Sequence, residues 1–314
     1  RNPTWSHKDR LTTVGITKAL EVGARCVIAS STGNQGISAA AYAARAGIPC
    51  VLLTGTTSPE SVKTFMRSCG AMVFEMDSSK ERITLVESCV REFGFFPLTG
   101  FGKSGKKGAN PYAIDGYKSL AIEILTQLGK VPDYIVFPVA GGDSLVGTWK
   151  GFVELRELGC VDRLPRMVAA EAIGSLESAL AEKLAVPKKM APRDTVAFAV
   201  GSPEGTYQAL KAIRDSSGDA ISLEDEEIMA AQAMLARSEG FFVEPSSALS
   251  VAAVKKLRDR DHIGSECSIV AVLTSCGIKE SESASRRMPA NPRVGADLSD
   301  FEIKLKTEYG FSPR

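Results

Sequence analysis

Residues 26–36 decide the fold class of this chain. They read Cys26-Val27-Ile28-Ala29-Ser30-Ser31-Thr32-Gly33-Asn34-Gln35-Gly36. The first four residues form a short apolar run typical of a buried strand, and the alanine-rich segment 37–45 that follows is typical of a helix. A small polar turn between a strand and a helix exposes backbone N–H groups that bind anions. We therefore expect a ligand at this turn, at the carboxyl edge of a parallel sheet.

A second turn of this kind follows the strongly apolar segment 134–139. It reads Ala140-Gly141-Gly142-Asp143-Ser144-Leu145 and leads into a predicted helix. Glycines let a ligand approach the backbone closely, so we expect a phosphate here. The turn is neither a Walker loop, because no Gly-Lys-Ser/Thr follows, nor the GxGxxG of a dinucleotide-binding fold. Repeated strand–helix units around both turns predict an α/β chain with two doubly wound parallel-sheet domains.

The first ten residues carry a lysine where a loop enters a helix. They read Arg1-Asn2-Pro3-Thr4-Trp5-Ser6-His7-Lys8-Asp9-Arg10. Turn formers and capping residues precede Lys8, which places it at a helix start. The positive end of a helix favours the neutral amine, the form that reacts with a carbonyl carbon. By itself the segment is better explained by a solvated lysine, and only the two glycine-containing turns favour a cofactor site.

The composition excludes several classes of function. There are 38 Lys and Arg against 37 Asp and Glu, so no charge excess favours nucleic acid or an anionic membrane surface, and we expect a small-molecule substrate. No apolar run approaches the roughly 20 residues of a membrane span, and no signal peptide is visible. Seven scattered cysteines, mostly in apolar segments, indicate a reduced, cytoplasmic protein.

Metal and hydrolase chemistry are not expected either. No pair of cysteines has zinc spacing, and the chain has only two histidines, His7 and His262, so we predict neither a metal site nor a Ser-His-Asp triad. The sequence begins on Arg1 rather than Met, directly on an informative motif, so we expect further residues ahead of it in the native protein.

Several segments taken in order resemble one enzyme family. They are Asn-Pro-Thr-x-Ser-x-Lys-Asp-Arg at 2–10, Ser-Thr-Gly-Asn at 31–34, Ala-Ala-Tyr-Ala-Ala-Arg-Ala-Gly at 40–47, Asn-Pro-Tyr at 110–112, Glu-Pro-Ser-Ser-Ala at 244–248 and Leu-Thr-x-x-Gly-x-Lys at 273–279. In this order they resemble the pyridoxal phosphate (PLP) enzymes of fold type II, which include tryptophan synthase β, serine and threonine dehydratases and threonine synthase. Threonine synthase is the member that the chain resembles most.

The resemblance implies a pyridoxal 5′-phosphate cofactor and a role for each matching residue. Lys8 is expected to form a Schiff base with the cofactor and to move the proton at the substrate Cα. Asn34 is expected to hydrogen-bond the cofactor's 3′-oxygen, and His7 to pack beside the ring. Thr274 is expected to face the pyridine nitrogen, where a hydroxyl, unlike a carboxylate, does not enforce protonation.

Two further sets of residues follow from the same resemblance. The set expected to hold the cofactor phosphate is Gly141, Gly142, Asp143, Ser144 and Leu145. The set expected to bind the substrate, near its carboxylate, is Ser31, Thr32, Gly33 and Gln35. The Asp143 carboxylate would repel a phosphate, so we expect this side chain to face away from it.

The resemblance also implies a domain organisation and an assembly. Residues 1–128 are expected to form an N-terminal part with the PLP lysine and a mobile small subdomain at about 22–100. Residues 129–280 are expected to form the phosphate-binding α/β domain, residues 281–314 a linker and tail, and the whole enzyme a homodimer. The boundary loop contains Lys103, Lys106 and Lys107, which could attract an anionic substrate, although a solvated charge run explains them better.

The expected reaction is proton removal at Cα of a small amino acid, followed by loss of a β or γ group, as in a PLP-dependent lyase. Conversion of O-phosphohomoserine to threonine and phosphate is the first expectation. Similar threonine synthases usually have Arg where Ala113 stands, a candidate to bind the substrate phosphate. Its absence keeps β-elimination or β-replacement open, as in a serine/threonine ammonia-lyase. An inactive PLP-binding regulator is the third reading, against which Lys8, Asn34 and Thr274 argue.

Overall fold

A computed structural model gives the fold of residues 2–100 and 110–313. The chain divides into two compact units, the first ending at Glu280 and the second running from Ser281, and each is described by itself. Lys103, Lys106 and Lys107 lie outside the described residues. The subdomain boundaries expected near residues 22, 100 and 128 stay predictions.

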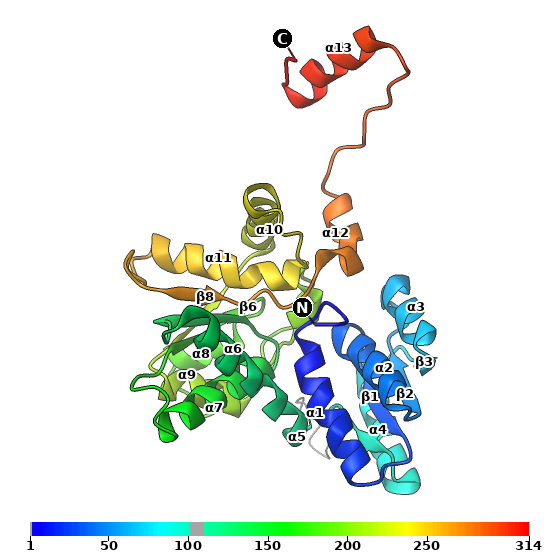
Figure 1. The fold of residues 1–314 in the computed structure, drawn as a ribbon, viewed down its shortest axis with the longest axis vertical. Coiled ribbons are helices and arrows are strands. Elements are labelled where there is room, and N and C mark those ends of the chain that lie inside the picture. Colours follow the sequence, from blue (N-terminus) through cyan, green and yellow to red (C-terminus); the bar gives the residue numbers. More distant parts are fainter. Residues whose placement is uncertain (1, 101–109, 314) are drawn as a thin grey trace. The chain divides into compact units, whose positions relative to one another are not determined.

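The first sheet is parallel and has the strand order β3-β2-β1-β4. Its strands are β1 (Val27–Ser30), β2 (Cys50–Thr54), β3 (Met72–Glu75) and β4 (Phe96–Pro97). The helices between them are α2 (Asn34–Ala46), α3 (Glu60–Ser68) and α4 (Ser79–Phe93). In Figure 1 this sheet and its helices occupy the blue and cyan part of the chain.

The second sheet is also parallel and has the order β7-β6-β5-β8. Its strands are β5 (Tyr134–Pro138), β6 (Arg166–Glu171), β7 (Asp219–Ser222) and β8 (Ile269–Ala271). Its helices are α6 (Lys118–Leu128), α7 (Asp143–Glu157), α8 (Ser175–Ala181), α9 (Tyr207–Asp215), α10 (Asp225–Glu239) and α11 (Pro245–Asp259), with the short turn η2 (Phe198–Val200) between α8 and α9. The prediction of two parallel sheets in an α/β chain is therefore confirmed.

Successive side chains of a strand pack against helices on opposite faces of each sheet. On β5, Val136 belongs to the apolar core shared with α10 and α11, whereas Ile135 and Phe137 belong to the core shared with α6, α7 and α9. On β1, Ile28 packs toward α4 while Val27 packs toward α2. Because successive strand residues point to opposite faces, one apolar run serves two cores. This explains why strands β1 and β5 read as continuous apolar segments.

Helix α1 (Lys8–Glu21) packs against elements associated with both sheets. It contacts α2 on one side, and on the other α5 (Pro111–Ile114) and the turn η1 (Asp115–Tyr117). Figure 1 shows α1 between the two sheets. The segment ahead of it crosses to the end of β8, where Ser6 pairs with Ser275 and the Cys276 amide donates to Trp5 O at 3.2 Å.

Local contacts explain where two helices begin. Helix α1 begins at Lys8, where the turn formers and capping residues ahead of it predicted a helix start. Helix α3 begins at Glu60 with Pro59 as its N-cap, and the hydroxyl of the preceding Ser58 pairs with Thr54 Oγ1 at 2.9 Å. The short strands β4 and β7 were not predicted, since each has at most four residues and little alternation.

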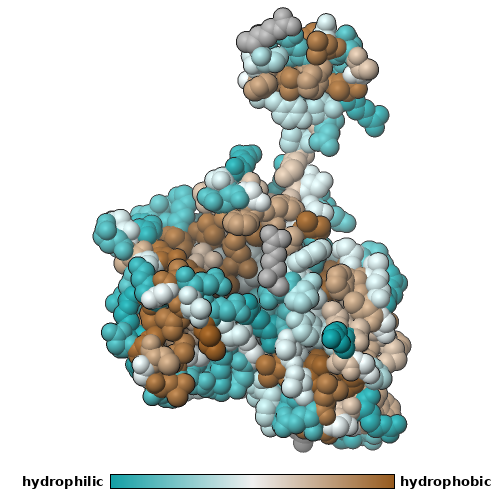
Figure 2. Space-filling view, viewed as in Figure 1, coloured by the Kyte–Doolittle hydropathy of each residue, from teal (hydrophilic) through white to brown (hydrophobic). Residues whose placement is uncertain are grey.

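The second unit contains α12 (Ser281–Ser285) and α13 (Leu298–Tyr309), preceded in the chain by the turn η3 (Gly277–Glu280). The segment expected to form a linker and tail contains α13, whose N-terminus is capped by the Asp297 side chain, which accepts from the Asp300 amide at 2.9 Å. In the described part of the chain, no helix combines the length and apolar character needed to cross a bilayer. The face drawn in Figure 2 intersperses hydrophilic and hydrophobic residues.

We predict that Gly116→Ala loosens the packing of α1. A Cβ at Gly116 would lie 2.0 Å from the backbone oxygen of Arg10, so α1 or η1 has to move. The expected loss in free energy of unfolding is about 1–3 kcal/mol, measured by urea denaturation. Gly264→Ala is the matched control, because a Cβ there meets nothing within 4 Å. Equal denaturation midpoints for the two variants would contradict the prediction.

Candidate active site

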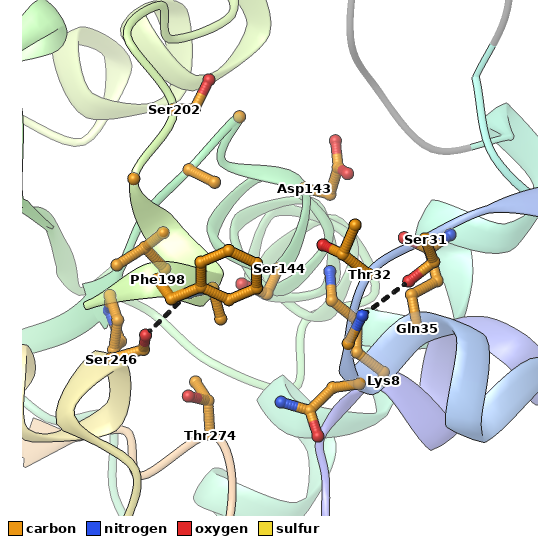
Figure 3. Close-up of a pocket in the computed structure, with 18 of the residues that line it drawn as sticks. Lys8, Ser31, Thr32, Gln35, Asp143, Ser144, Phe198, Ser202, Ser246 and Thr274 are labelled. Carbon is orange, nitrogen blue, oxygen red and sulfur yellow. Dashed lines mark hydrogen bonds between the residues drawn. The ribbon is translucent and has the colours of Figure 1, made fainter. Parts of the chain in front are cut away.

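A cavity of about 390 Å³ lies at the carboxyl ends of strands from both sheets. Its lining comes from the segment before α1, the β1–α2 turn, the β5–α7 turn, the segment 198–202 and the end of β8. Figure 3 shows Lys8, Thr274 and Phe198 around it. Both glycine-containing turns picked out in the sequence meet here, as expected for the carboxyl edges of α/β sheets.

Lys8 is the first residue of α1, is half-buried and lines the cavity. Its Nζ lies 5.9 Å from the centre of the Tyr117 ring, and its backbone N–H donates to Ser6 Oγ at 3.2 Å. Desolvation lowers the pKa of Lys8, an effect that the Asp143 carboxylate partly opposes. A lysine in such surroundings carries a neutral, nucleophilic amine at lower pH than a lysine in water.

Asp9 fixes the backbone on which Lys8 stands. Its buried carboxylate accepts hydrogen bonds from the Thr4 amide at 2.8 Å, the Thr4 hydroxyl at 2.5 Å and the Ser38 hydroxyl at 2.7 Å. Thr4 belongs to the loop before Lys8, and Ser38 belongs to α2. The carboxylate therefore joins the lysine segment to α2, the helix that begins at the β1–α2 turn.

His7 lines the cavity and packs against protein on its other side. Its ring stacks on Tyr117 with 5.3 Å between centroids, and its Nδ1 lies 3.2 Å from Thr274 O, which also accepts the His7 amide at 2.9 Å. Burial, helped by the nearby Lys8 charge, lowers the pKa of His7 to about 3. The imidazole is therefore neutral at physiological pH.

The β1–α2 turn brings Ser31, Thr32, Gly33, Asn34 and Gln35 together on the cavity wall. Ser31 Oγ accepts from the amides of Gly33 at 3.3 Å and Gly36 at 2.9 Å, so it stabilises the turn itself. The Gln35 amide nitrogen donates to Leu98 O at 3.1 Å. These contacts order the turn, and Thr32 remains the hydroxyl that Figure 3 shows beside the cavity.

The β5–α7 turn supplies a cradle for an anion. Gly142 has φ +97°, and a Cβ there would lie 2.4 Å from the Ala209 Cβ, so only glycine fits. The Gly141 carbonyl is fixed by the Thr206 hydroxyl at 2.6 Å. The first hydrogen bond of α7 runs from the Val146 amide to Gly142 O at 2.9 Å, which leaves the preceding amides of the first turn outside the helical ladder.

The residues of the β5–α7 turn do not all border the cavity. Gly141, Gly142, Asp143 and Ser144 line the cavity. The Leu145 side chain is fully buried in the core between β5 and α7 and does not border the cavity, so only its backbone can serve a ligand. Asp143 lines the cavity, and its carboxylate raises the pKa of Lys8. That the carboxylate faces away from the phosphate stays a prediction.

Thr274 ends the β8 segment and presents a hydroxyl to the cavity. Its Oγ1 lies 2.8 Å from Ser247 Oγ, and Ser247 also accepts the Ser275 amide at 2.8 Å. The side chain is 6% exposed, so its rotamer is fixed by this contact. The hydroxyl is therefore held in place before any ligand binds.

Sequence reasoning missed several residues of the cavity wall. Phe198, Ser202 and Ser246 line it, and Ser246 Oγ accepts the Ala199 amide at 3.1 Å, drawn as a dashed line in Figure 3. The segment around Phe198 carried no periodic pattern, so nothing local pointed to it. Ser246 lies inside the Glu-Pro-Ser-Ser-Ala motif, which was a usable signal because it matched the family without a role attached.

These features fit a phosphorylated, carbonyl-bearing cofactor. A lysine with a lowered pKa lies on one wall, a glycine cradle at a helix N-terminus on another, and a fixed hydroxyl on a third. The cavity volume falls in the range of small-molecule sites. In the described residues no cluster of His, Cys, Asp and Glu has the arrangement of a metal site. Fold and site thus define an α/β enzyme with an organic cofactor.

Comparisons with known proteins identify the family. The family model described as "Pyridoxal-phosphate dependent enzyme" matches residues 1–275. The threonine synthase of Mycobacterium tuberculosis is 36% identical over 298 residues, which cover 94% of this chain and 80% of that protein. The threonine synthase of Methanosarcina acetivorans is 39% identical over 290 residues, covering 90% of this chain and 69% of that protein.

Solved structures share the fold at lower identity. Maize serine racemase superposes with a TM-score of 0.75 at 23% identity, covering 91% of this chain and 83% of that one. Threonine deaminase isoform 2 from Solanum lycopersicum gives a TM-score of 0.75 at 19% identity, covering 90% and 79%. The chain belongs to the pyridoxal-phosphate dependent enzyme family, with the type II fold. It is a PLP-dependent lyase similar to threonine synthases.

We predict that Gly142→Ala weakens PLP binding at least tenfold. The alanine has to adopt a positive φ and its Cβ collides with Ala209, which moves the first turn of α7. Titration of the apoprotein with PLP, followed by absorbance, measures the dissociation constant. Pyridoxal, which lacks the phosphate, should lose less affinity than PLP in the same variant. Unchanged PLP affinity would exclude this turn as the phosphate cradle.

We predict that His7 makes the apoprotein less stable in acid. Because folding lowers the His7 pKa from 6.5 to about 3, the unfolded chain binds the proton more readily, and stability falls as pH drops below 6.5. His7→Phe keeps an aromatic ring without the ionisable group. Urea denaturation at pH 7 and pH 5 should show a smaller stability loss in the variant, by roughly 1–2 kcal/mol. Equal losses would mean that His7 is protonated in the folded protein.

Proposed function

We propose that this enzyme converts O-phosphohomoserine and water to threonine and inorganic phosphate. The observation that carries the proposal is the identity of 33–39% to curated threonine synthases along 90–97% of this chain. In this reaction the Cγ–O bond to phosphate breaks, a hydroxyl from water adds at Cβ, and Cγ ends as the methyl group. The lowered pKa of Lys8 suits it to proton transfer, and the glycine turn at Gly142 suits the binding of a phosphorylated cofactor.

The proposal assigns roles to residues around the cavity. Lys8 would hold the cofactor covalently, and its neutral amine would accept and return the substrate Cα proton. Asn34 and Thr274 would bind the cofactor's 3′-oxygen and ring nitrogen, respectively. Gly141, Gly142, Asp143, Ser144 and Leu145 are the proposed phosphate turn, acting through backbone groups, and His7 packs beside the site. When bound, pyridoxal phosphate delocalises the negative charge that proton loss leaves on Cα.

The substrate side is assigned to the β1–α2 turn. Ser31, Thr32, Gly33 and Gln35 are proposed to hold the substrate near its carboxylate, because the N-terminus of α2 points backbone amides to this wall. Ordering of the turn by Ser31 and Gln35 reduces the entropy lost when substrate binds.

A buried arginine lies close to the β1–α2 turn, although it does not itself line the cavity. Arg82 is 7% exposed, its Nη1 donates to Met76 O at 2.6 Å, and its Nε has no hydrogen-bond partner among the described residues. Within that part of the chain no carboxylate forms an ion pair with it. A Cβ at Gly55 would lie 3.6 Å from Arg82 Nη1 and 3.3 Å from Thr32 Cγ2, so one glycine separates the guanidinium from the substrate-side turn.

Ala113 is the observation that favours a second candidate. It is fully buried in α5, where it packs with Leu11 and Tyr117 and does not border the cavity. An arginine would need room that α1 now fills, so no cation reaches the cavity from this position. The second candidate is therefore β-elimination or β-replacement on serine or threonine, and the third is an inactive PLP-binding regulator.

A cytoplasmic homodimer is part of the proposal for either enzyme.

Steady-state assays test the proposal. We expect the purified holoenzyme to release equal amounts of phosphate and L-threonine from O-phosphohomoserine. We expect Lys8→Ala to lose at least a thousandfold in turnover, because among the described residues Lys8 is the lysine that lines the cavity. Turnover of serine or threonine to a 2-oxo acid, with none of O-phosphohomoserine, would replace the first candidate by the second. No turnover of any of them, with PLP bound, would favour the regulator.

Arg82→Met adds a test of the substrate's charge. Loss of the guanidinium should raise KM for O-phosphohomoserine about tenfold or more, because a buried cation behind the β1–α2 turn attracts an anion bound at that turn. The KM for amino acids with uncharged side chains should change less. Arg193→Met is the matched control, since Arg193 also donates to backbone carbonyls but pairs with Glu224 away from the cavity.

A further inference from the structure

The carboxamide of Asn34 is held by three residues from the far end of the chain. Its Nδ2 donates to the two carboxylate oxygens of Glu244, at 3.0 and 2.9 Å. Its Oδ1 accepts from Ser275 Oγ at 3.1 Å and from the ammonium of Lys279. Asn34 lines the cavity, so these contacts decide which of its polar atoms faces a ligand.

Lys279 connects this cluster to the segment that carries the catalytic lysine. Its Nζ also donates to Thr4 O at 3.1 Å, and Thr4 in turn donates to the Asp9 carboxylate. One series of hydrogen bonds therefore runs from Asp9, the neighbour of Lys8, through Lys279 to Asn34. The two residues expected to touch the cofactor at its 4′ and 3′ substituents share one support.

The support is built from groups that are costly to bury. Glu244 is 4% exposed, and burial raises its pKa, an effect opposed by Asn34 and by the Lys279 charge. Desolvation lowers the pKa of Lys279, opposed by Glu244 and Asp9. Buried ion pairs of this kind add little net stability compared with apolar side chains. Their value here lies in the group that they orient.

The contacts fix the orientation of the Asn34 amide. An ammonium has only donors and a carboxylate has only acceptors, so Lys279 has to meet the amide oxygen and Glu244 the amide nitrogen. The two N–H bonds of a primary amide diverge by much more than the angle that one carboxylate subtends, so a single N–H serves both Glu244 oxygens. The second N–H is left for a ligand.

We propose that Lys279 and Glu244 are positioning residues that hold Asn34 so that an N–H, not a carbonyl, faces the cofactor's 3′-oxygen. The Lys279 ammonium on Oδ1 also polarises the amide and makes that N–H a stronger donor. The deprotonated 3′-oxygen is thereby favoured. This inference rests on the proposed contact between Asn34 and the 3′-oxygen, but not on the identity of the substrate.

The experiment compares Lys279→Met with Lys279→Arg in the reconstituted holoenzyme. Lys279→Met removes the charge and the donors, so PLP should bind at least tenfold more weakly, and the pH midpoint of the bound cofactor's visible absorbance should rise by about half a unit or more. Lys279→Arg keeps a cation that can reach Asn34 Oδ1, and should recover PLP affinity to within about threefold of the native chain.

Lys256→Met is the matched control for a structural effect. Lys256 also bonds a backbone carbonyl and a carboxylate, Ser222 O at 3.0 Å and Glu227 at 2.9 Å, but neither of these partners lines the cavity, whereas the Lys279 partner Asn34 does. It should leave the absorbance midpoint unchanged, whatever it does to the urea denaturation of the apoprotein. An equal midpoint shift in Lys256→Met and Lys279→Met would overturn the proposal.

A double-mutant cycle shows whether Lys279 acts through Asn34. In an Asn34→Ala background, Lys279→Met should change the absorbance midpoint by less than half of its effect in the native chain. A full, additive shift would overturn the proposal, as would an unchanged spectrum in Lys279→Met. These readouts need PLP but no substrate, so a failure to turn over O-phosphohomoserine leaves the inference intact, and the reverse also holds.

Discussion

The buried carboxylate of Asp9 is the interaction on which the site depends. It lies in the first turn of α1, directly after Lys8, and collects donors from the preceding loop and from α2. Each of these buried donors would cost about 1–3 kcal/mol if it lost its acceptor. The carboxylate therefore holds the lysine segment in one position relative to the β1–α2 turn. The rest of the cavity is arranged around that fixed pair.

The burial that this anchoring produces also sets the chemistry of the lysine. Because α1 is packed between α2 and η1, Lys8 is desolvated, which favours its neutral amine. Tyr117 and the neutral His7 close the wall behind it without adding a charge. Asp143 works in the opposite direction, which keeps the amine from losing its proton affinity altogether. A residue that moves protons needs such a balance.

The sequence predicted those parts of the site whose causes are local. The β1–α2 and β5–α7 turns combine a strand end, glycine and a helix start within a few residues, so their place at the sheet edge follows from short-range patterns. The partners of Asn34 could not be found in this way, because they lie 210 to 245 residues away. The Leu145 side chain was assigned with its turn, although helical geometry at the third position turns it into the core.

The positions of positive charge show why a motif alone cannot fix a substrate. Position 113 carries alanine where similar threonine synthases are expected to carry arginine, and α1 packs against this position. Arg82 lies on another helix, in a segment without a family motif, and only the packing of Gly55 brings it next to Thr32. An anion-binding function depends on the field in the cavity rather than on which residue produces it. In the proposed reaction, the absence of an arginine at position 113 is therefore compatible with a phosphorylated substrate, provided that Arg82 on α4 supplies the positive charge.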